Sequence, residues 1–207
     1  MNPNADILFA DSKQLRSEKT LSDILDAANL IVEEGDPSLF TTRNLAQKSG
    51  YALGTLVRRL QSIENVYLWA IKKTRDKHFK TVSNSITQID VNTPIEVFAE
   101  EMTDKTFAGI QKVNPAVMRF FESRVTRVKG IQADYFFYMD VVIEPYLKAV
   151  KSNRTNTFRE LSWSEASLLL RNICLLVERP FMEDNPIAGT SEHRKIIIDA
   201  IVRWLGK

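Results

Sequence analysis

The chain has 207 residues, of which 44% are hydrophobic and 26% charged, so it can bury a substantial core and is not disordered by composition. Its net charge of +2 is too small to indicate a polyanionic partner, so any argument for DNA binding depends on where the basic residues lie. One cysteine, Cys174, excludes an intramolecular disulfide, and no run of about 18 apolar residues indicates a membrane helix. The N-terminus lacks a signal-peptide pattern, so we expect a cytoplasmic protein with no membrane partner.

The first helices are short and separated by glycines. Apolar residues recur at helical spacing over residues 21–32 and predict a first helix. Two short helices follow over residues 41–48 and 53–60, with Gly50 in the turn between them. Ser62 is suited to cap the next helix, which weakens in a polar stretch over residues 83–92.

The later helices have clear start signals. A capping box over residues 93–96, with Pro94 at the first helical position, starts one helix, and a second capping box over residues 162–165 starts another. Ser191 is expected to open the last helix, which runs to the C-terminus.

Prolines shape the remaining segments. Asn114 and Pro115 start a helix through about residue 127, and Pro145 is expected to kink a long helix over residues 132–152. The helix that begins after Ser162 is expected to end before Pro180. No strand is convincing, so the sequence predicts an all-α chain of about nine helices.

The stretch over residues 45–66, LAQKSGYALGTLVRRLQSIENV, has the parts of a helix-turn-helix. Gly50 suits the tight turn, and Leu56 and Leu60 can hold the back of the second helix on the domain. Small residues keep the start of that helix slim enough to enter the major groove: Ala52, Gly54 and Thr55. Between residues 37 and 63 there are four basic residues and no acidic one: Arg43, Lys48, Arg58 and Arg59. This pattern by itself leaves open both a DNA-reading head and a helical corner that only packs.

Residues 17–70 resemble the DNA-binding domain of TetR-family transcriptional regulators. The resemblance is carried by Ile24 to Gly35, Thr41, Leu45-Ala46, Gly50, Gly54-Thr55-Leu56 and Ser62-Ile63-Glu64. It implies a dimeric repressor in which a small molecule alters the spacing of two DNA-reading heads. The helix-turn-helix, DNA-binding head would span residues 1–80, extending into the helix after Ser62, and a helical ligand-binding and dimerisation domain would span residues 81–207.

The resemblance implies that double-stranded DNA contacts nine residues: Thr42, Arg43, Ala52, Leu53, Gly54, Thr55, Val57, Arg58 and Arg59. The sequence departs from the family pattern at three positions. Val57 replaces the usual tyrosine, Leu60 an aromatic residue and Ile63 the usual lysine, and the tyrosine and lysine usually contact phosphates. Nearby arginines could compensate. The alternative is an all-α protein of the same fold that binds a small molecule or a protein partner and has weakened or lost DNA binding.

The C-terminal half offers a dimer interface and an effector site. The helices over residues 163–179 and 191–205 are apolar nearly all round, which favours pairing with their copies in a homodimer over burial in a monomer core. We hypothesise a small apolar or aromatic effector between the helices that start at Pro94, Pro115 and Gln132. Its expected contacts are Phe107, Phe120, Phe121, Tyr135, Tyr138, Met139 and Arg171.

Enzyme chemistry finds no support in the sequence. His78 and His193 lie far apart in charged helical stretches and are expected at the surface, and Cys174 lies in an apolar run where a thiolate is disfavoured. There is no glycine-rich phosphate loop or nucleophile elbow. We therefore predict no catalytic residue, metal or cofactor.

Overall fold

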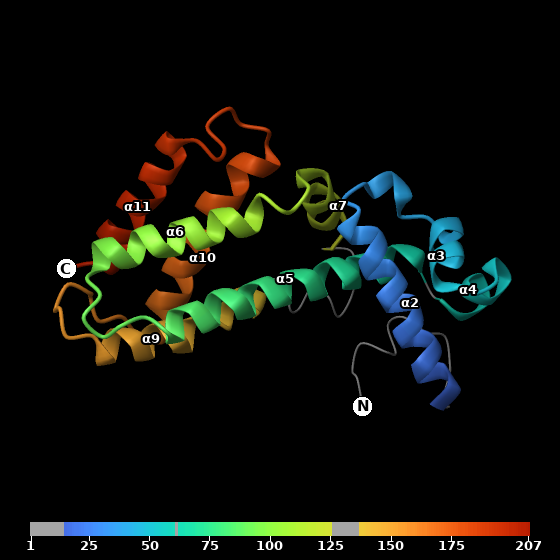
Figure 1. The fold of residues 1–207 in the computed structure, drawn as a ribbon, viewed down its shortest axis with the longest axis horizontal. Coiled ribbons are helices and arrows are strands. Elements are labelled where there is room, and N and C mark those ends of the chain that lie inside the picture. Colours follow the sequence, from blue (N-terminus) through green and yellow to red (C-terminus); the bar gives the residue numbers. More distant parts are fainter. Residues whose placement is uncertain (1–14, 61, 126–136) are drawn as a thin grey trace. The chain divides into compact units, whose positions relative to one another are not determined.

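The computed structural model of the chain describes residues 15–60, 62–125 and 137–207. These residues are predominantly helical (Figure 1), and Phe158 and Gly206 form an isolated antiparallel bridge. The predicted all-α fold is confirmed. Within the described ranges, no helix is long and apolar enough to cross a membrane.

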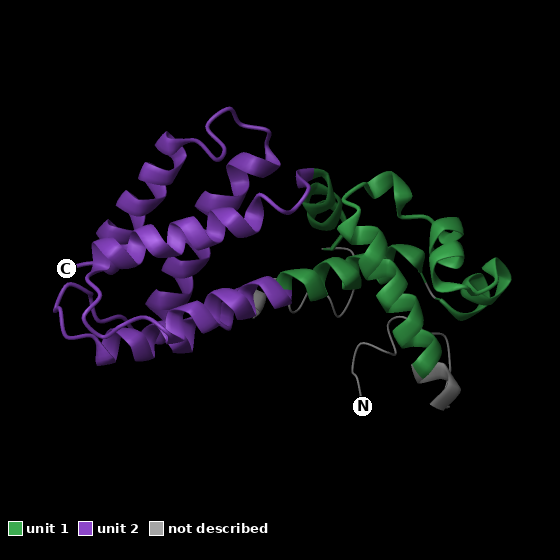
Figure 2. Ribbon diagram, in the orientation of Figure 1, with its two compact units in different colours: residues 1–75, 116–135 green, residues 76–115, 136–207 purple. Residues whose placement is uncertain are grey.

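The chain divides into two compact units (Figure 2). Unit 1 comprises residues 1–75 and 116–135, and unit 2 comprises residues 76–115 and 136–207. The sequence placed a boundary at residue 80 and assigned everything beyond it to the second domain. Residues 116–125 group with unit 1 instead because their apolar side chains, including Val117 and Phe121, are buried in its core.

Unit 1 is a helical head. It contains α2 (Leu15–Glu33), the 3-10 helix η1 (Pro37–Leu39), α3 (Thr42–Ser49), α4 (Leu53–Arg59), the first half of α5 (Ile63–Thr87) and most of α7 (Pro115–Val125). The apolar stripe of α2 faces inward, and Ile24 and Ala28 are fully enclosed with Leu45 of α3 and Leu56 of α4. The head therefore has its own hydrophobic core.

An aromatic group ties the helix-turn-helix to the rest of the head. Phe40 stacks on Tyr67 of α5 with ring centroids 4.7 Å apart, and Phe120 of α7 meets Phe40 edge-on at 5.0 Å. The buried Tyr67 hydroxyl donates to the carbonyl of Thr41 at 3.0 Å, directly before α3 begins. Burial of this hydroxyl raises its pKa well above the usual range, so it remains protonated as a donor.

Unit 2 is a second helical body. It contains the rest of α5, α6 (Ile95–Ile110), α8 (Phe137–Asp140), α9 (Ile143–Ser152), α10 (Trp163–Met182) and α11 (Ser191–Leu205). Helix α6 packs against α11, and α10 packs against both α9 and α11. The predicted capping box of α10 is present, because Ser162 accepts from the backbone of Glu165 and Glu165 accepts from that of Ser162.

Two helix predictions in unit 2 are wrong, one in the continuity of a helix and one in its cap. The segment over residues 132–152 is not one kinked helix, because α8 and α9 are separated at Val141 and Val142, and residues 132–136 lie outside the described residues. Pro145 lies in the first turn of α9, where its missing N–H costs nothing. Helix α6 has no capping box at residues 93–96, because its N-cap is Pro94, which forms no side-chain cap hydrogen bond. The N–H of Ile95 donates to Thr157 Oγ1 at 3.0 Å.

Helix α10 continues through Pro180 to Met182, contrary to the prediction that it ends earlier. Pro180 cannot donate to the carbonyl of Leu176 one turn before it. His193 Nε2 lies 3.0 Å from that carbonyl, and the N–H of Gly189 donates to His193 Nδ1 at 3.2 Å. Because Nδ1 accepts, Nε2 carries the hydrogen and donates.

His193 is therefore a buried structural residue, not the surface histidine that was expected. Its exposed fraction is 2%, and its ring packs against Phe107 and Phe181. Helix α11 begins at Ser191, as predicted, and Thr190 is its N-cap, whose hydroxyl oxygen accepts from the backbone N–H of His193. The N-terminus of α11 is thus held to α10 by the side chain that replaces the missing proline bond.

Candidate functional site

Helices α3 and α4 form a helix-turn-helix with a left-handed residue at the turn. Thr41 caps α3 by accepting from the backbone of Asn44 at 3.2 Å. Gly50 ends α3 with φ +74°, a conformation that strains residues with a side chain. Ala52 then caps α4 without a side-chain hydrogen bond, and three residues separate the end of α3 from the start of α4.

The inner face of α4 is anchored in the core of unit 1. Leu56 is fully buried and Leu60, directly after the helix, is nearly so. The hydroxyl of Tyr51, in the turn, donates to Asp23 of α2 at 2.8 Å. Buried leucines typically contribute about 2–5 kcal/mol each relative to alanine, so these contacts hold a helix of only seven residues in place.

The outer face of α4 is apolar and slim. Val57 is 66% exposed and Leu53 is 49% exposed, and one turn apart they share this face with Gly54. A Cβ atom built on Gly54 meets nothing within 4 Å. No packing inside the head therefore requires glycine at this position, although glycine costs up to about 1 kcal/mol in a helix relative to alanine.

Both helices of the helix-turn-helix carry exposed cations. Arg43, the second residue of α3, and Arg58, near the end of α4, are exposed, whereas Arg59 is half-buried. Among the described residues, no acidic group forms an ion pair with these three arginines. Lys48 differs, because its Nζ lies 2.9 Å from Glu34 Oε1. Of the remaining residues expected at DNA, Ala52 is exposed, and Thr42 and Thr55 are half-buried.

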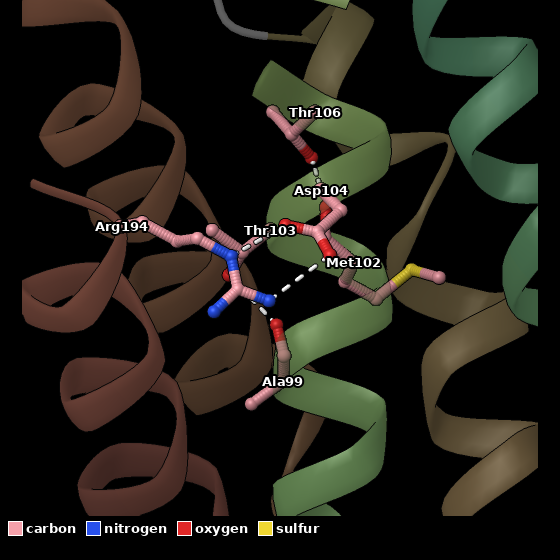
Figure 3. A network of polar contacts seen from close by, with 6 residues as sticks. All are labelled: Ala99, Met102, Thr103, Asp104, Thr106 and Arg194. Atoms are coloured by element: carbon pink, nitrogen blue, oxygen red, sulfur yellow. Dashed lines mark hydrogen bonds and ion pairs between the residues drawn. The ribbon is translucent and has the colours of Figure 1, made fainter. Parts of the chain in front are cut away.

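Unit 2 contains an apolar cavity of about 60 Å³. Its lining comes from α5, α6, α10 and α11 together with Val142: Phe79, Val82, Ile86, Phe98, Met102, Thr103, Thr106, Leu170, Ile173, Cys174, Val177, Ile197, Ile201 and Leu205. The two threonine hydroxyls are already used, since Thr103 donates to the carbonyl of Ala99 and Thr106 to that of Met102, each at 2.7 Å (Figure 3). These threonines therefore have no free hydroxyl hydrogen to donate into the cavity.

An ion pair between Asp104 and Arg194 joins α6 to α11 beside this cavity wall. Figure 3 shows the guanidinium across the carboxylate, with Nε 2.6 Å from Oδ1 and Nη2 3.0 Å from Oδ2. The hydrogen bonds from Arg194 hold the pKa of Asp104 below its usual range. Both groups are partly exposed, so solvent screening limits what the pair adds to stability.

The predicted effector residues do not gather around this cavity. Phe107 packs against Phe181 and His193, Met139 is buried in the core of unit 2, and Phe120 and Phe121 belong to unit 1. Arg171 is held by Asp140, with Nη2 2.6 Å from Oδ1. Tyr135 and the side chain of Tyr138 lie outside the described residues. The lining residues that the sequence missed carry no signal of their own, because a cavity wall and a packed core have the same helical spacing.

Helices α10 and α11 also expose apolar side chains. Leu168 is 62% exposed, and Leu175, seven residues later on the same face of α10, is 39% exposed. Trp163 and Ile196 are exposed to a similar degree. Protein interfaces use contiguous exposed apolar patches, whereas apolar side chains that are exposed singly are normal on a protein surface.

Comparison with solved structures decides the fold. A TetR-family transcription regulator from Marinobacter aquaeolei VT8 is 14% identical to the chain, with a TM-score of 0.53 over 93% of this chain and 98% of that chain. A protein from Mesorhizobium loti MAFF303099 described as a TetR-family transcriptional regulator is 11% identical, with a TM-score of 0.64 over 94% of this chain and 100% of that chain. No family model and no curated protein matches the sequence.

The chain has the TetR-family fold. The three departures from the family's sequence pattern differ in place, and Leu60 is buried in the core of unit 1. Val57 is on the outer face of α4, whereas Ile63 is half-buried and packs against the core at the start of α5. Ser62 caps α5 by accepting from the backbone of Asn65 at 3.4 Å, as the sequence predicts. Only the change at Val57 therefore alters the surface that a partner of α4 meets.

Proposed function

We propose that the protein is a cytoplasmic, dimeric transcriptional regulator that binds double-stranded DNA with α4 in the major groove. The observation that carries this proposal is the outer surface of the helix-turn-helix. It combines a slim, exposed face of α4 with two exposed arginines that have no acidic partner among the described residues, Arg43 and Arg58. A helix that reads DNA needs this combination of close approach and positive charge.

The placement of charge favours DNA over an acidic protein surface. Arg43 lies at the start of α3 and Arg58 at the end of α4, so both helices of the helix-turn-helix contribute an exposed cation. No acidic residue occurs between residues 37 and 63. In the major groove the base edges lie between two rows of phosphates, and this arrangement would place an arginine toward the backbone while α4 faces the bases.

A dimer is supported by the apolar side chains that α10 and α11 expose. Leu168 and Leu175 form a stripe along α10, and a two-fold axis would bring each stripe against its copy. A dimer presents two copies of α4 and therefore recognises two half-sites, whose spacing is set by the dimer geometry. Bound across a promoter, such a dimer excludes the transcription machinery, so we propose that the protein acts as a repressor.

The cavity in unit 2 is the proposed effector site, and its apolar lining selects an uncharged, apolar small molecule. At about 60 Å³ it holds only a few heavy atoms, so a larger effector binds a conformation in which the cavity is wider. Met102, a flexible side chain in the lining, can supply part of that space. An effector that prefers the wider state shifts the population toward it, and this differential affinity would release DNA.

The test removes two positive charges from the head and compares the loss of DNA affinity with that caused by removing two positive charges from unit 2. The variant combines Arg43→Ala with Arg58→Ala, and the control combines Lys80→Ala with Lys151→Ala, two exposed residues of unit 2. The probe is a duplex enriched from a random library by the wild-type protein. Each lost phosphate contact should make the plot of log K against log salt less steep by about 0.9, and the control variant should keep a slope close to that of the wild-type protein.

If both double variants lose affinity equally, net charge rather than this surface governs binding, and the assignment of the interface is wrong. If the wild-type protein enriches no duplex at any salt concentration, DNA binding itself is refuted.

A further inference from the structure

The outer face of α4 offers the bases almost no hydrogen-bonding side chain. Leu53, Gly54 and Val57 occupy it, with Arg58 at its edge, and Thr55 and Arg59 are half-buried on the flanks. Helices that read bases through hydrogen bonds carry asparagine, glutamine, arginine or acidic side chains at such positions. Here the centre of the face consists of two branched aliphatic side chains and a glycine.

The major groove has one apolar feature that such a face can match. Thymine carries a C5-methyl group, whereas the other three bases present only donors and acceptors on their groove edges. An aliphatic side chain that covers a cytosine or adenine edge leaves the exocyclic amine without a partner, which carries a penalty. The same side chain that covers a thymine methyl removes apolar surface from water on both molecules.

Gly54 provides a second, independent observation. Space for a Cβ atom is empty at this position, so nothing within the head excludes alanine. An outside surface that approaches the backbone of α4 closely would account for the glycine. With Gly54 between them in the chain, Leu53 and Val57 then lie near enough to the groove floor for van der Waals contact with base edges.

We propose that α4 specifies its half-site by apolar contacts of Val57 and Leu53 with thymine methyl groups. The proposal rests on the DNA-binding function proposed above and names what that surface reads. Arg58 supplies the charged edge contact, and the arginine-flanked apolar face is complementary to a groove floor of methyl groups between phosphates. The half-site should therefore contain thymines at positions where the methyl group, and not only the A·T pair, determines affinity.

Uracil differs from thymine only by the missing methyl, which makes it the direct probe. A duplex enriched by the full-length protein is resynthesised with each thymine replaced in turn by deoxyuridine, and affinity is measured by fluorescence anisotropy. Loss of one buried methyl should weaken binding about three- to fivefold at the contacted thymines. Replacement at thymines outside the half-sites should change nothing.

Protein variants assign the effect to α4. In Val57→Thr the side chain keeps its shape but gains a hydroxyl, and in Val57→Ala it is shortened. In both variants, the ratio of the affinities for the thymine and uracil duplexes should fall toward one at one thymine per half-site. Leu30→Ala is the matched control, since Leu30 is a 50% exposed apolar residue on α2 of the same unit. It should retain the full uracil effect. Because Val57 is largely exposed, neither replacement threatens the core.

The outcomes separate the two proposals. Specific binding with no uracil effect at any thymine overturns methyl readout and leaves DNA binding intact. A uracil effect that is unchanged in both Val57 variants and in Leu53→Ala shows that another element reads the methyl groups, which also overturns the proposal. If no duplex is enriched, the DNA-binding function fails and methyl readout fails with it, and the exposed face of α4 becomes a site for an apolar protein partner.

Discussion

Gly54→Ala should make the protein more stable and a weaker DNA binder at the same time. The position lies inside α4, its φ is not in the left-handed region, and the added methyl meets no atom within 4 Å. Replacing glycine with alanine in a helix contributes about 0.5–1 kcal/mol. For a chain of this length, that corresponds to a rise in Tm of about 1–4 °C.

The same methyl group should interfere with DNA. It projects from the slim face of α4, toward the surface that the groove floor would occupy, and packing there tolerates little added volume. We expect at least a tenfold loss of affinity for an enriched duplex, about 1.4 kcal/mol, together with the gain in stability. Thermal unfolding and fluorescence anisotropy on the same protein preparation measure both quantities.

Gly50→Ala is the matched control for the stability part. Its Cβ would also meet nothing within 4 Å, but φ is +74°, so alanine is strained there and should cost about 1–2 kcal/mol. If alanine raises the stability at Gly54 and lowers it at Gly50, then backbone conformation, and not open space for the side chain, determines the effect. If Gly54→Ala gains stability and retains full affinity, α4 does not approach DNA through this face and the reasoning is refuted.

Three further predictions concern unit 2. Leu168→Glu should shift the protein from dimer to monomer in light scattering after size-exclusion chromatography, whereas Val97→Glu, at a similarly exposed apolar position on α6, should not. His193→Phe should cost about 1–3 kcal/mol in urea unfolding, because it leaves the carbonyl one turn before Pro180 unbonded. Adding Pro180→Ala should recover part of that loss by restoring the N–H, and purely additive effects would contradict this hydrogen-bond assignment. Asp104→Asn should lower stability at neutral pH, and the difference from wild type should vanish as the pH falls below the lowered pKa of Asp104. The reason is that a carboxylate with a depressed folded-state pKa stabilises the fold only while it is ionised. A difference in stability that persists in strong acid would contradict this prediction.

Local signals were sufficient to predict most of the helices. Thr41, Ser62 and Ser162 each cap a helix where the sequence places one, because a capping side chain bonds to a backbone group only two or three residues away. Gly50 ends α3 for an equally local reason. These interactions depend on neighbours in the chain, so they can be predicted from the chain alone.

The errors share a non-local cause. Pro180 remains within a helix because His193, distant in sequence, donates to the carbonyl that the proline leaves free. The start of α6 is bonded by Thr157 in place of its own capping box. The residues that surround a helix end are brought there by the fold, so they cannot be predicted from the neighbouring sequence. The burial of His193 depends on the fold in the same way.

The candidate DNA-binding face was located by sequence, but its character was not. Small residues and arginines around Gly54 indicate a helix that can approach DNA, and the structure shows which side chains point outward. Val57 is exposed and Ile63 is half-buried against the core, which separates two departures from the family pattern that look alike in sequence. The cavity in unit 2 had no sequence signal, because it forms where side chains from several helices fail to fill the space between them.

The most direct test of the account is competition binding of the wild-type protein. Fluorescence anisotropy would follow an enriched duplex against a scrambled duplex of the same composition, at two salt concentrations. We predict that binding to the enriched duplex persists in an excess of the scrambled duplex, and that the affinity falls steeply as the salt concentration rises. Equal affinity for the two duplexes at both salt concentrations would contradict sequence-specific DNA binding by this helix-turn-helix.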